Sequence, residues 1–284
     1  MRAPSNPANF LILGMVSLLP ACATAPLVQG YGLTSYDQMT PSDGMLTKSR
    51  VHVEKDEVLA AKTINILPTA FPPTIASKLS NEQRALVANA ISRSLCVNLS
   101  DRFRVVSPHE PADLTVRTAV TQATETDEVA AGVSAAASLG MSFVDTSVPI
   151  PTPRIPIGLG NLSIEAEALD SSGQQQASML WGRGATAFFG SPKASKVSDA
   201  YDLAEAFGDD FASLLVKGKT PFGNGGFELP SLPSWQKINS TMGFAPKYAA
   251  CETYGRFPGI AGVVGGQLGL PPEWTDSGAK QASQ

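Results

Sequence analysis

The 284-residue sequence predicts an α+β domain in which a small mixed or antiparallel sheet carries two helices packed on one face. Two observations point to this class. Several short segments alternate apolar and polar residues as strands do, and two longer segments repeat apolar residues at helical spacing. Their order along the chain is strand, helix, four strands and helix. We expect a separate N-terminal segment and a tether before the domain, and a Gly- and Pro-rich tail after it.

The first strand and helix have clear boundaries. Residues 62–67 form the expected strand, which the prolines of residues 68–73 end. Ser80 and Gln83 then have the spacing of a capping box. Apolar residues follow at helical spacing, so residues 81–100 predict an amphipathic helix. These are Leu86, Val87, Ala90, Ile91, Leu95 and Leu99.

The later elements follow the same reasoning. In residues 162–168, apolar residues alternate with Ser163, Glu165 and Glu167, as in a strand with one buried face. The turn Asp170 to Gly173 leads into its expected partner strand. The full set comprises strands at 103–106, 114–124, 162–168 and 177–189, and a final helix capped by Ser198 and running to Leu215.

Residues 129–144 carry no charge and are rich in Ala and Gly, and prolines follow up to residue 156. One interpretation is a covered helix and an extended crossover that close the core. The other is a surface that meets lipid or a partner, because large exposed apolar patches mark interaction sites. The segment is too short to span a membrane.

Cys22 closes the segment Leu-Pro-Ala-Cys directly after the uncharged apolar run 10–20, with Arg2 before it. This arrangement is typical of a bacterial lipoprotein signal, so we expect residues 1–21 to be removed and Cys22 to be lipidated. The alternatives are an ordinary cleaved signal cut near residues 23–25, or an uncleaved anchor. Because Ala23 and not Asp follows the cysteine, we expect an outer-membrane protein that faces the periplasm.

Processing changes the charge and the cysteine count. Removal of residues 1–21 deletes Arg2 and no acid, which leaves 20 basic against 25 acidic side chains. That balance gives no electrostatic footprint for nucleic acid. Cys96 and Cys251 would remain in an oxidising compartment, where a disulfide between them is the hypothesis. The alternative is two separate thiols, one buried in the helix and one in a loop.

Composition divides the chain into four parts. We expect the signal peptide at 1–21, a polar lipidated tether at 22–50, the α+β domain at 51–219 and a Gly, Pro and aromatic extension at 220–284. The extension is interpreted as a wrap over the domain, a partner-binding arm or a disordered segment.

Catalytic signatures are lacking. His52 and His109 have no metal-site spacing, and the stretch Gly182 to Ala187 resembles a dinucleotide motif without opening a helix. Glu165 and Glu167 share one face of a strand and could divide acid and base roles, although a polar face or a surface for Arg or Lys is favoured. We therefore expect no catalytic residue, no cofactor and no metal.

Two segments resemble a known family. Residues 30–37, Gly-Tyr-Gly-Leu-Thr-Ser-Tyr-Asp, and residues 163–170, Ser-Ile-Glu-Ala-Glu-Ala-Leu-Asp, resemble bacterial lipoproteins grouped as domain of unknown function 3313. The resemblance covers residues 22–219, although Tyr31-Gly32 stands where the family usually has Phe. It implies an envelope lipoprotein with no established activity.

The expected function is that of a non-enzymatic envelope lipoprotein serving as an interaction or assembly module. Lipid on Cys22 would anchor the protein in the membrane. Residues 220–284 or the apolar segment 129–156 would bind a protein partner. A small-ligand or cell-wall binding module is the alternative and would need a concave pocket between helix and sheet. An envelope hydrolase ranks third and would need clustered carboxylates in a cleft.

Overall fold

The structure, a computed structural model, describes residues 25–142, 158–186, 192–222 and 235–276. Within these ranges the chain forms one mixed sheet of seven strands in the order β1-β2-β7-β6-β5-β3-β4. The strands are β1 (Thr40–Pro41), β2 (Thr47–Val53), β3 (Thr63–Ile66), β4 (Arg104–Val106), β5 (Leu114–Thr124), β6 (Asn161–Asp170) and β7 (Gln175–Gly184). The α+β class is confirmed, but the sheet is larger than predicted.

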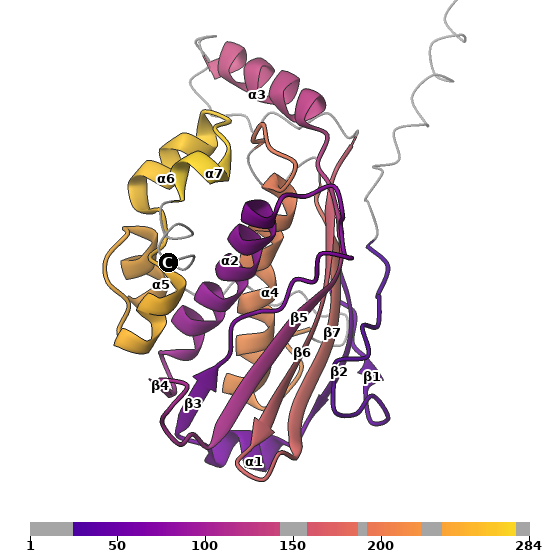
Figure 1. Cartoon of the computed structure of the whole chain (residues 1–284), viewed down its shortest axis with the longest axis vertical. Coiled ribbons are helices and arrows are strands. Elements are labelled where there is room, and N and C mark those ends of the chain that lie inside the picture. The colour runs from indigo at the N-terminus through magenta and orange to yellow at the C-terminus, as the bar shows by residue number, and fades with distance from the viewer. Residues whose placement is uncertain (1–24, 143–157, 187–191, 223–234, 277–284) are drawn as a thin grey trace, which may run out of the picture.

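The long antiparallel strands β2, β7, β6 and β5 form the centre of the sheet (Figure 1). Asn161 of β6 pairs with Gly184 on one side and with Thr124 on the other, so these three residues share one end of the sheet. We call it the Asn161 end. The opposite end carries the turn between Asp170 and Gln175 and is called the turn end. β3 runs parallel to both β5 and β4.

Two long helices, α2 (Asn81–Leu99) and α4 (Ser198–Lys217), cover one face of the sheet and pack against each other (Figure 1). The core between the layers contains large aromatic side chains. The Trp181 and Phe207 rings meet edge to face with centroids 5.7 Å apart, and Phe211 stacks on Phe207. The short helix α1 (Lys55–Ala60) lies at the turn end.

The helix termini agree with the prediction in one case and differ in the other. At α2 the Ser80 side chain accepts from the Gln83 backbone N–H, and the Gln83 side chain accepts from the Ser80 backbone N–H, so the capping box is confirmed. At α4 the capping residue is Val197, and Ser198 already lies inside the helix. The prediction of Ser198 as the cap was wrong, because its hydroxyl instead donates to the Thr126 hydroxyl.

The N-terminal segment predicted as a tether belongs to the fold from residue 25 onward. Residues 25–39 lie on the face of the sheet opposite the helices, and β1 and β2 then extend the sheet. The sheet therefore begins at Thr40, ahead of residue 51, where the domain was predicted to start. The reason lies in β2, whose buried positions include the polar Thr47 and Ser49, so that its sequence lacks apolar alternation.

Residues 235–276, which we call the C-terminal wrap, pack on the side of α2 that faces away from the sheet (Figure 1). The wrap comprises α5 (Trp235–Thr241), the 3₁₀ helix η2 (Ala249–Tyr254), α6 (Gly259–Gln267) and α7 (Pro272–Thr275). The molecule thus has three layers: the sheet, the α2/α4 pair and the wrap. Residues 223–234 and 277–284 of the predicted extension lie outside the described residues.

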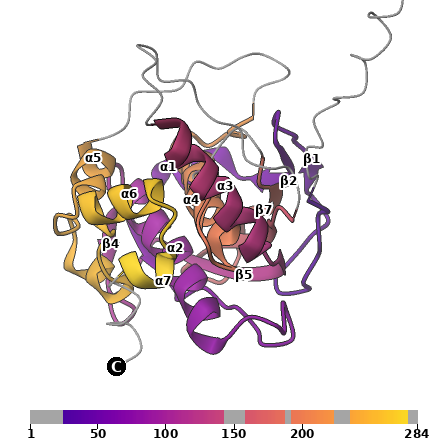
Figure 2. The same cartoon turned by 90° about the horizontal axis from the view of Figure 1, so that it is seen from above.

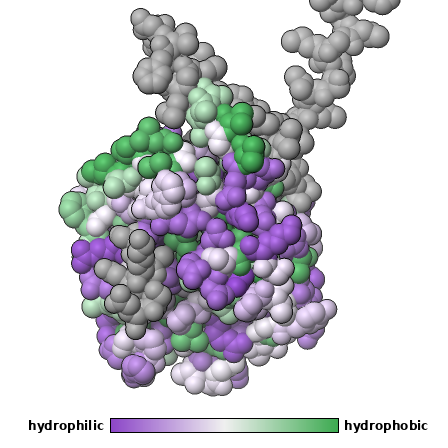
Figure 3. Space-filling view, turned by 45° about the horizontal axis from the view of Figure 1, so that its top comes forward, coloured by the Kyte–Doolittle hydropathy of each residue, from purple (hydrophilic) through white to green (hydrophobic). Residues whose placement is uncertain are grey.

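The uncharged segment after β5 forms the helix α3 (Glu128–Ser142), which lies across the Asn161 end (Figures 1 and 2). The helix begins four residues after the end of β5 in the sequence. Just before it, the Asp127 N–H donates to the Gly158 carbonyl at 2.8 Å. Hydrophobic residues gather at the surface of this end of the molecule (Figure 3). The prolines predicted as a crossover, residues 149–156, lie outside the described residues.

Candidate functional site

Glu165 of β6 points to the face opposite the helices, where residues 25–36 cover it. It is 2% exposed. Its carboxylate accepts from the backbone N–H groups of Gly30 and Gly32 at 2.9 and 2.8 Å, and from the Tyr36 hydroxyl at 2.7 Å. Such charge-assisted bonds are stronger than neutral ones. Burial, and then the neighbouring carboxylate, raise the pKa of Tyr36 to about 12, so the phenol remains a donor.

Glu167, two residues along the same strand, is 0% exposed and is bound in the same manner. It accepts from the Thr34 backbone N–H and the Gln175 side-chain amide, both at 2.8 Å. The Arg117 guanidinium lies 3.0 Å from its other oxygen and neutralises the charge. One interpretation of the sequence was that these carboxylates form a surface for an arginine or lysine of a partner protein. The arginine that pairs with Glu167 instead belongs to this chain and lies on the neighbouring strand β5.

Glycine is required where the segment approaches Glu165. A Cβ placed on Gly32 would lie 2.5 Å from a carboxylate oxygen, and one on Gly30 would lie 2.8 Å from it. The two segments that resemble the family therefore form one unit, in which residues 25–36, here called the lead-in, are bound to β6 by buried carboxylates. These carboxylates are engaged with the chain itself and present no open acid and base pair.

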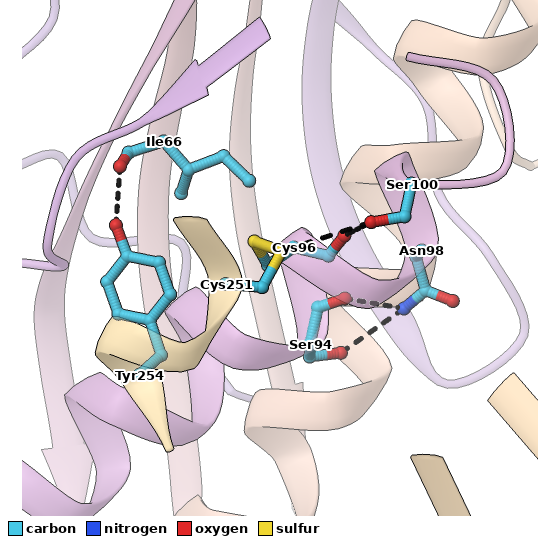
Figure 4. The surroundings of a disulfide bond; sticks show 7 residues. All are labelled: Ile66, Ser94, Cys96, Asn98, Ser100, Cys251 and Tyr254. Atoms are coloured by element: carbon cyan, nitrogen blue, oxygen red, sulfur yellow. Dashed lines mark hydrogen bonds between the residues drawn. A yellow bond between two sulfur atoms is a disulfide. The ribbon is translucent and has the colours of Figure 1, made fainter. Parts of the chain in front are cut away.

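The C-terminal wrap is fixed to α2 by a covalent bond. Cys96 and Cys251 form a disulfide with Cα atoms 5.7 Å apart, as hypothesised (Figure 4). Both cysteines are buried. Near the bridge, the Tyr254 hydroxyl donates to the Ile66 carbonyl at 2.5 Å, which ties the wrap to β3 as well (Figure 4).

A buried ion pair fixes the end of the wrap. Arg93 on α2 donates to both carboxylate oxygens of Asp276, at 3.2 and 2.5 Å. The Tyr201 hydroxyl donates to the same carboxylate at 2.6 Å, and the Arg93 guanidinium lies over the Phe257 ring at 4.7 Å from its centroid. Burial raises the pKa of Tyr201 well above its ordinary value. The sequence does not predict this cluster, because Arg93 and Asp276 are 183 positions apart along the chain and charged residues usually lie at the surface.

A pocket of about 320 Å³ lies between the α2/α4 layer and the wrap. This pocket is on the far side of the helices, whereas the ligand-binding alternative predicted one between helix and sheet. Three carboxylates of α4 line it, but Lys193 pairs with Asp202 and Lys237 with Asp209. Removal from water, and then the charge of Asp202, raise the pKa of Glu205 to about 7.

The wrap also exposes large apolar side chains on α5. Trp235 is 74% exposed, and Ile238 follows it at three-residue spacing on the same face of α5. Met242, also exposed, comes directly after the helix, and its N–H donates to the Ile238 carbonyl. Phe244 is exposed just beyond them. Such a cluster on a segment that is covalently fixed to the core is a candidate binding surface.

The other residues singled out in the sequence lie apart from these sites. Cys22 is outside the described residues. His52 lies on β2 with its Nε2 3.2 Å from a carboxylate oxygen of Glu54, and His109 is exposed in a turn. Gly182 lies within strand β7, where no helix opens. In the part of the chain that the structure describes, no group of His, Cys, Asp or Glu side chains could hold a metal ion.

The fold and these contacts define an α+β domain that is bound on opposite sides by its own terminal segments. Residues 31–211 match the family described as protein of unknown function (DUF3313), so the chain belongs to that family. The match begins within the lead-in and ends within α4, so the wrap lies beyond it. No curated protein matches the chain.

Two solved structures are distantly similar to the chain. One is a PelC dodecamer from Paraburkholderia phytofirmans, with 9% identity and a TM-score of 0.37 over 61% of this chain and 98% of that chain. The other is a DUF4136 family protein from Bacteroides thetaiotaomicron, with 10% identity and a TM-score of 0.33 over 62% and 100% of the two chains. These distant likenesses carry no argument about function.

Among the described residues, no helix combines the length and the hydrophobicity that crossing a bilayer requires.

Proposed function

We propose that this protein is an envelope lipoprotein, anchored in the outer membrane through lipid on Cys22 and facing the periplasm. The signal-like sequence before Cys22 supports the anchor. The buried Cys96–Cys251 disulfide supports an oxidising compartment. Labelling cells with a fatty-acid analogue tests this part, because Cys22→Ala should abolish both the lipid label and recovery with outer membranes. A Cys22→Ala variant that is still labelled would refute the assignment.

Within this setting the protein acts as a non-enzymatic interaction or assembly module whose binding surface is the C-terminal wrap. The observation that carries this proposal is the exposed apolar group of Trp235 and Ile238 on α5 and Met242 directly after it. Aromatic residues and Met are enriched in protein interfaces, where Trp contributes large binding energies. The partner is therefore an envelope protein with an apolar surface of its own.

The test is crosslinking in intact cells followed by co-purification, with point variants instead of a truncation. A chain ending at Lys219 would lose Cys251 and Asp276 and would expose buried α2, so its failure to bind would prove little. Trp235→Ser with Ile238→Ser should abolish recovery of the partner. Met45→Ser, at another highly exposed apolar residue, is the matched control and should retain it.

Recovery of the same partner with the α5 variant would move the contact elsewhere on the domain. Recovery of no partner by the unaltered chain would remove the module proposal.

A small-ligand or cell-wall binding module is the second candidate, and the pocket between α4 and the wrap favours it. Glu205, with its pKa near 7, would serve there as a hydrogen-bond partner of the ligand. Soluble cell-wall fragments should then raise the melting temperature of the protein and fail to do so for Glu205→Ala. A hydrolase ranks below this, because Lys193 and Lys237 already pair with the neighbouring carboxylates.

A further inference from the structure

The direction of the lead-in shows where the N-terminal chain leaves the domain. Pro26 accepts from the Ser163 hydroxyl near the Asn161 end of β6, and Thr34 binds Glu167 nearer the turn end. The lead-in therefore runs parallel to β6. Followed backward from Pro26, the chain leaves at the Asn161 end.

The link between this point and Cys22 is short. Ala25 is only 4% exposed, so the chain is already packed on the domain at that residue. Only Ala23 and Thr24 lie between it and Cys22, and the fully extended chain from Cys22 to Ala25 spans about 10 Å. A lipid on Cys22 would therefore hold the Asn161 end within about that distance of the bilayer surface.

Helix α3 lies across the same end. Ala131 and Ala135 are buried against the molecule, whereas Val129 is 76% exposed and Val133 is 53% exposed. No charged residue follows Glu128 in the helix. Gly269 of the wrap lies against Ala135, so exposed Leu268 and Leu270 continue this apolar surface. Figure 3 shows hydrophobic residues at this end.

We propose that the outward face of α3, with Val129 and Val133, rests on the surface of the bilayer that holds the lipid anchor. This proposal rests on lipidation of Cys22, as proposed above. Beyond Glu128 the helix carries no charge, and an apolar face suits the boundary between headgroups and acyl chains. The short link makes the bilayer the surface that α3 faces. The domain would then have a fixed orientation, with the turn end and α1 directed away from the membrane.

Single-cysteine labelling of the lipidated full chain tests the orientation. Lipid would occupy Cys22, and the disulfide occupies Cys96 and Cys251. A new cysteine is thus the one site for an environment-sensitive fluorophore. The labelled variants are Val133→Cys and Val129→Cys on α3, with Ser171→Cys as the control. Ser171 is exposed in the turn at the far end of β6, about 30 Å from the Asn161 end.

The variants are reconstituted into phosphatidylethanolamine and phosphatidylglycerol vesicles, with and without brominated acyl chains. We expect a blue shift and a loss of emission in brominated vesicles at positions 129 and 133, and neither at position 171. Flotation with vesicles and the mass of the lipidated protein report separately on the anchor.

Several outcomes would overturn the proposal. Floating, lipidated protein with an unshifted label at 133 would overturn the orientation and leave the anchor intact. A blue shift without quenching by brominated lipid would mean that protein, for example a second copy, covers α3. Protein without lipid would overturn the anchor and the orientation together.

Discussion

The lead-in and the C-terminal wrap both pack on the domain, but different interactions hold them in place. Backbone N–H groups of the lead-in bind two buried carboxylates on one face of the sheet. The wrap is held on α2 by a disulfide and a buried Arg93–Asp276 pair. The lead-in is thus held by hydrogen bonds, whereas the wrap has a covalent attachment and a buried ion pair. A polar N-terminal stretch is therefore as much a part of the fold as a cross-linked one.

Removal of the disulfide should have the largest effect. Cys96→Ala with Cys251→Ala is expected to lower the free energy of unfolding by about 4 kcal/mol, because the bridge closes a long loop in the unfolded chain. Urea denaturation at pH 7 measures this loss. Limited proteolysis should then cut the wrap and spare the lead-in. Equal cleavage of both segments would show that they do not behave independently.

The ion pair at the end of the wrap comes next. Asp276→Asn leaves the Arg93 charge buried without a counter-charge, which should lower the free energy of unfolding by about 3 kcal/mol. Glu252→Gln is the control, because its pair with Arg256 is exposed and should contribute less than about 1 kcal/mol. Both values come from urea denaturation. Similar small losses in the two variants would mean that burial of the Asp276 pair has no energetic consequence.

A smaller loss of stability is expected when the contact between Glu165 and the lead-in is weakened. Glu165→Gln keeps the size of the side chain but removes the charge that binds three donors, so the free energy of unfolding should fall by about 2 kcal/mol. Proteolysis should then cut residues 25–36 before the rest of the domain. Glu128→Gln, on the exposed start of α3, is the control and should leave this segment resistant. Resistance in both variants would refute the role of Glu165.

The smallest effect is expected at Glu205 in the pocket, as a change in how the free energy of unfolding depends on pH. The pKa of Glu205 is about 7 in the folded chain against 4.5 ordinarily, so the folded state binds the proton more tightly. The free energy of unfolding should therefore fall as pH rises from about 4.5 through 7. Glu205→Gln should flatten this profile by about 1 kcal/mol, less than the full shift implies because the side chain is partly solvated. Unchanged profiles by urea denaturation would contradict this assignment.

Much of the fold was predictable where side-chain periodicity reports burial. The helix after Ser80 and the strand around Glu165 appear where the sequence placed them. The prediction that this strand has only one buried face was wrong, because the lead-in covers the polar face as well. The disulfide was predictable because Cys96 lies at the edge of the apolar face of α2 and one other cysteine remained. β2 was missed because Thr47 and Ser49 occupy its buried positions.

The contacts of the lead-in leave almost no trace in the sequence. Its donors are backbone N–H groups, which every residue except proline has, and Gly30 and Gly32 alone hint at the close approach. The Arg93–Asp276 pair was missed for another reason. Two charged residues separated by most of the chain give no local pattern. Family resemblance linked the lead-in with the Glu165 strand, but only the structure shows that they touch.

Hydrogen exchange of the unaltered protein, followed by mass spectrometry, tests most directly whether the lead-in is part of the fold. The amides of Gly30, Gly32 and Thr34 donate to the buried carboxylates and should exchange as slowly as those of β6. The exposed turn residue Ser171 provides the fast reference within the same sample. Slow exchange at residues 30–34 would support a docked segment, and exchange as fast as in the turn would contradict it.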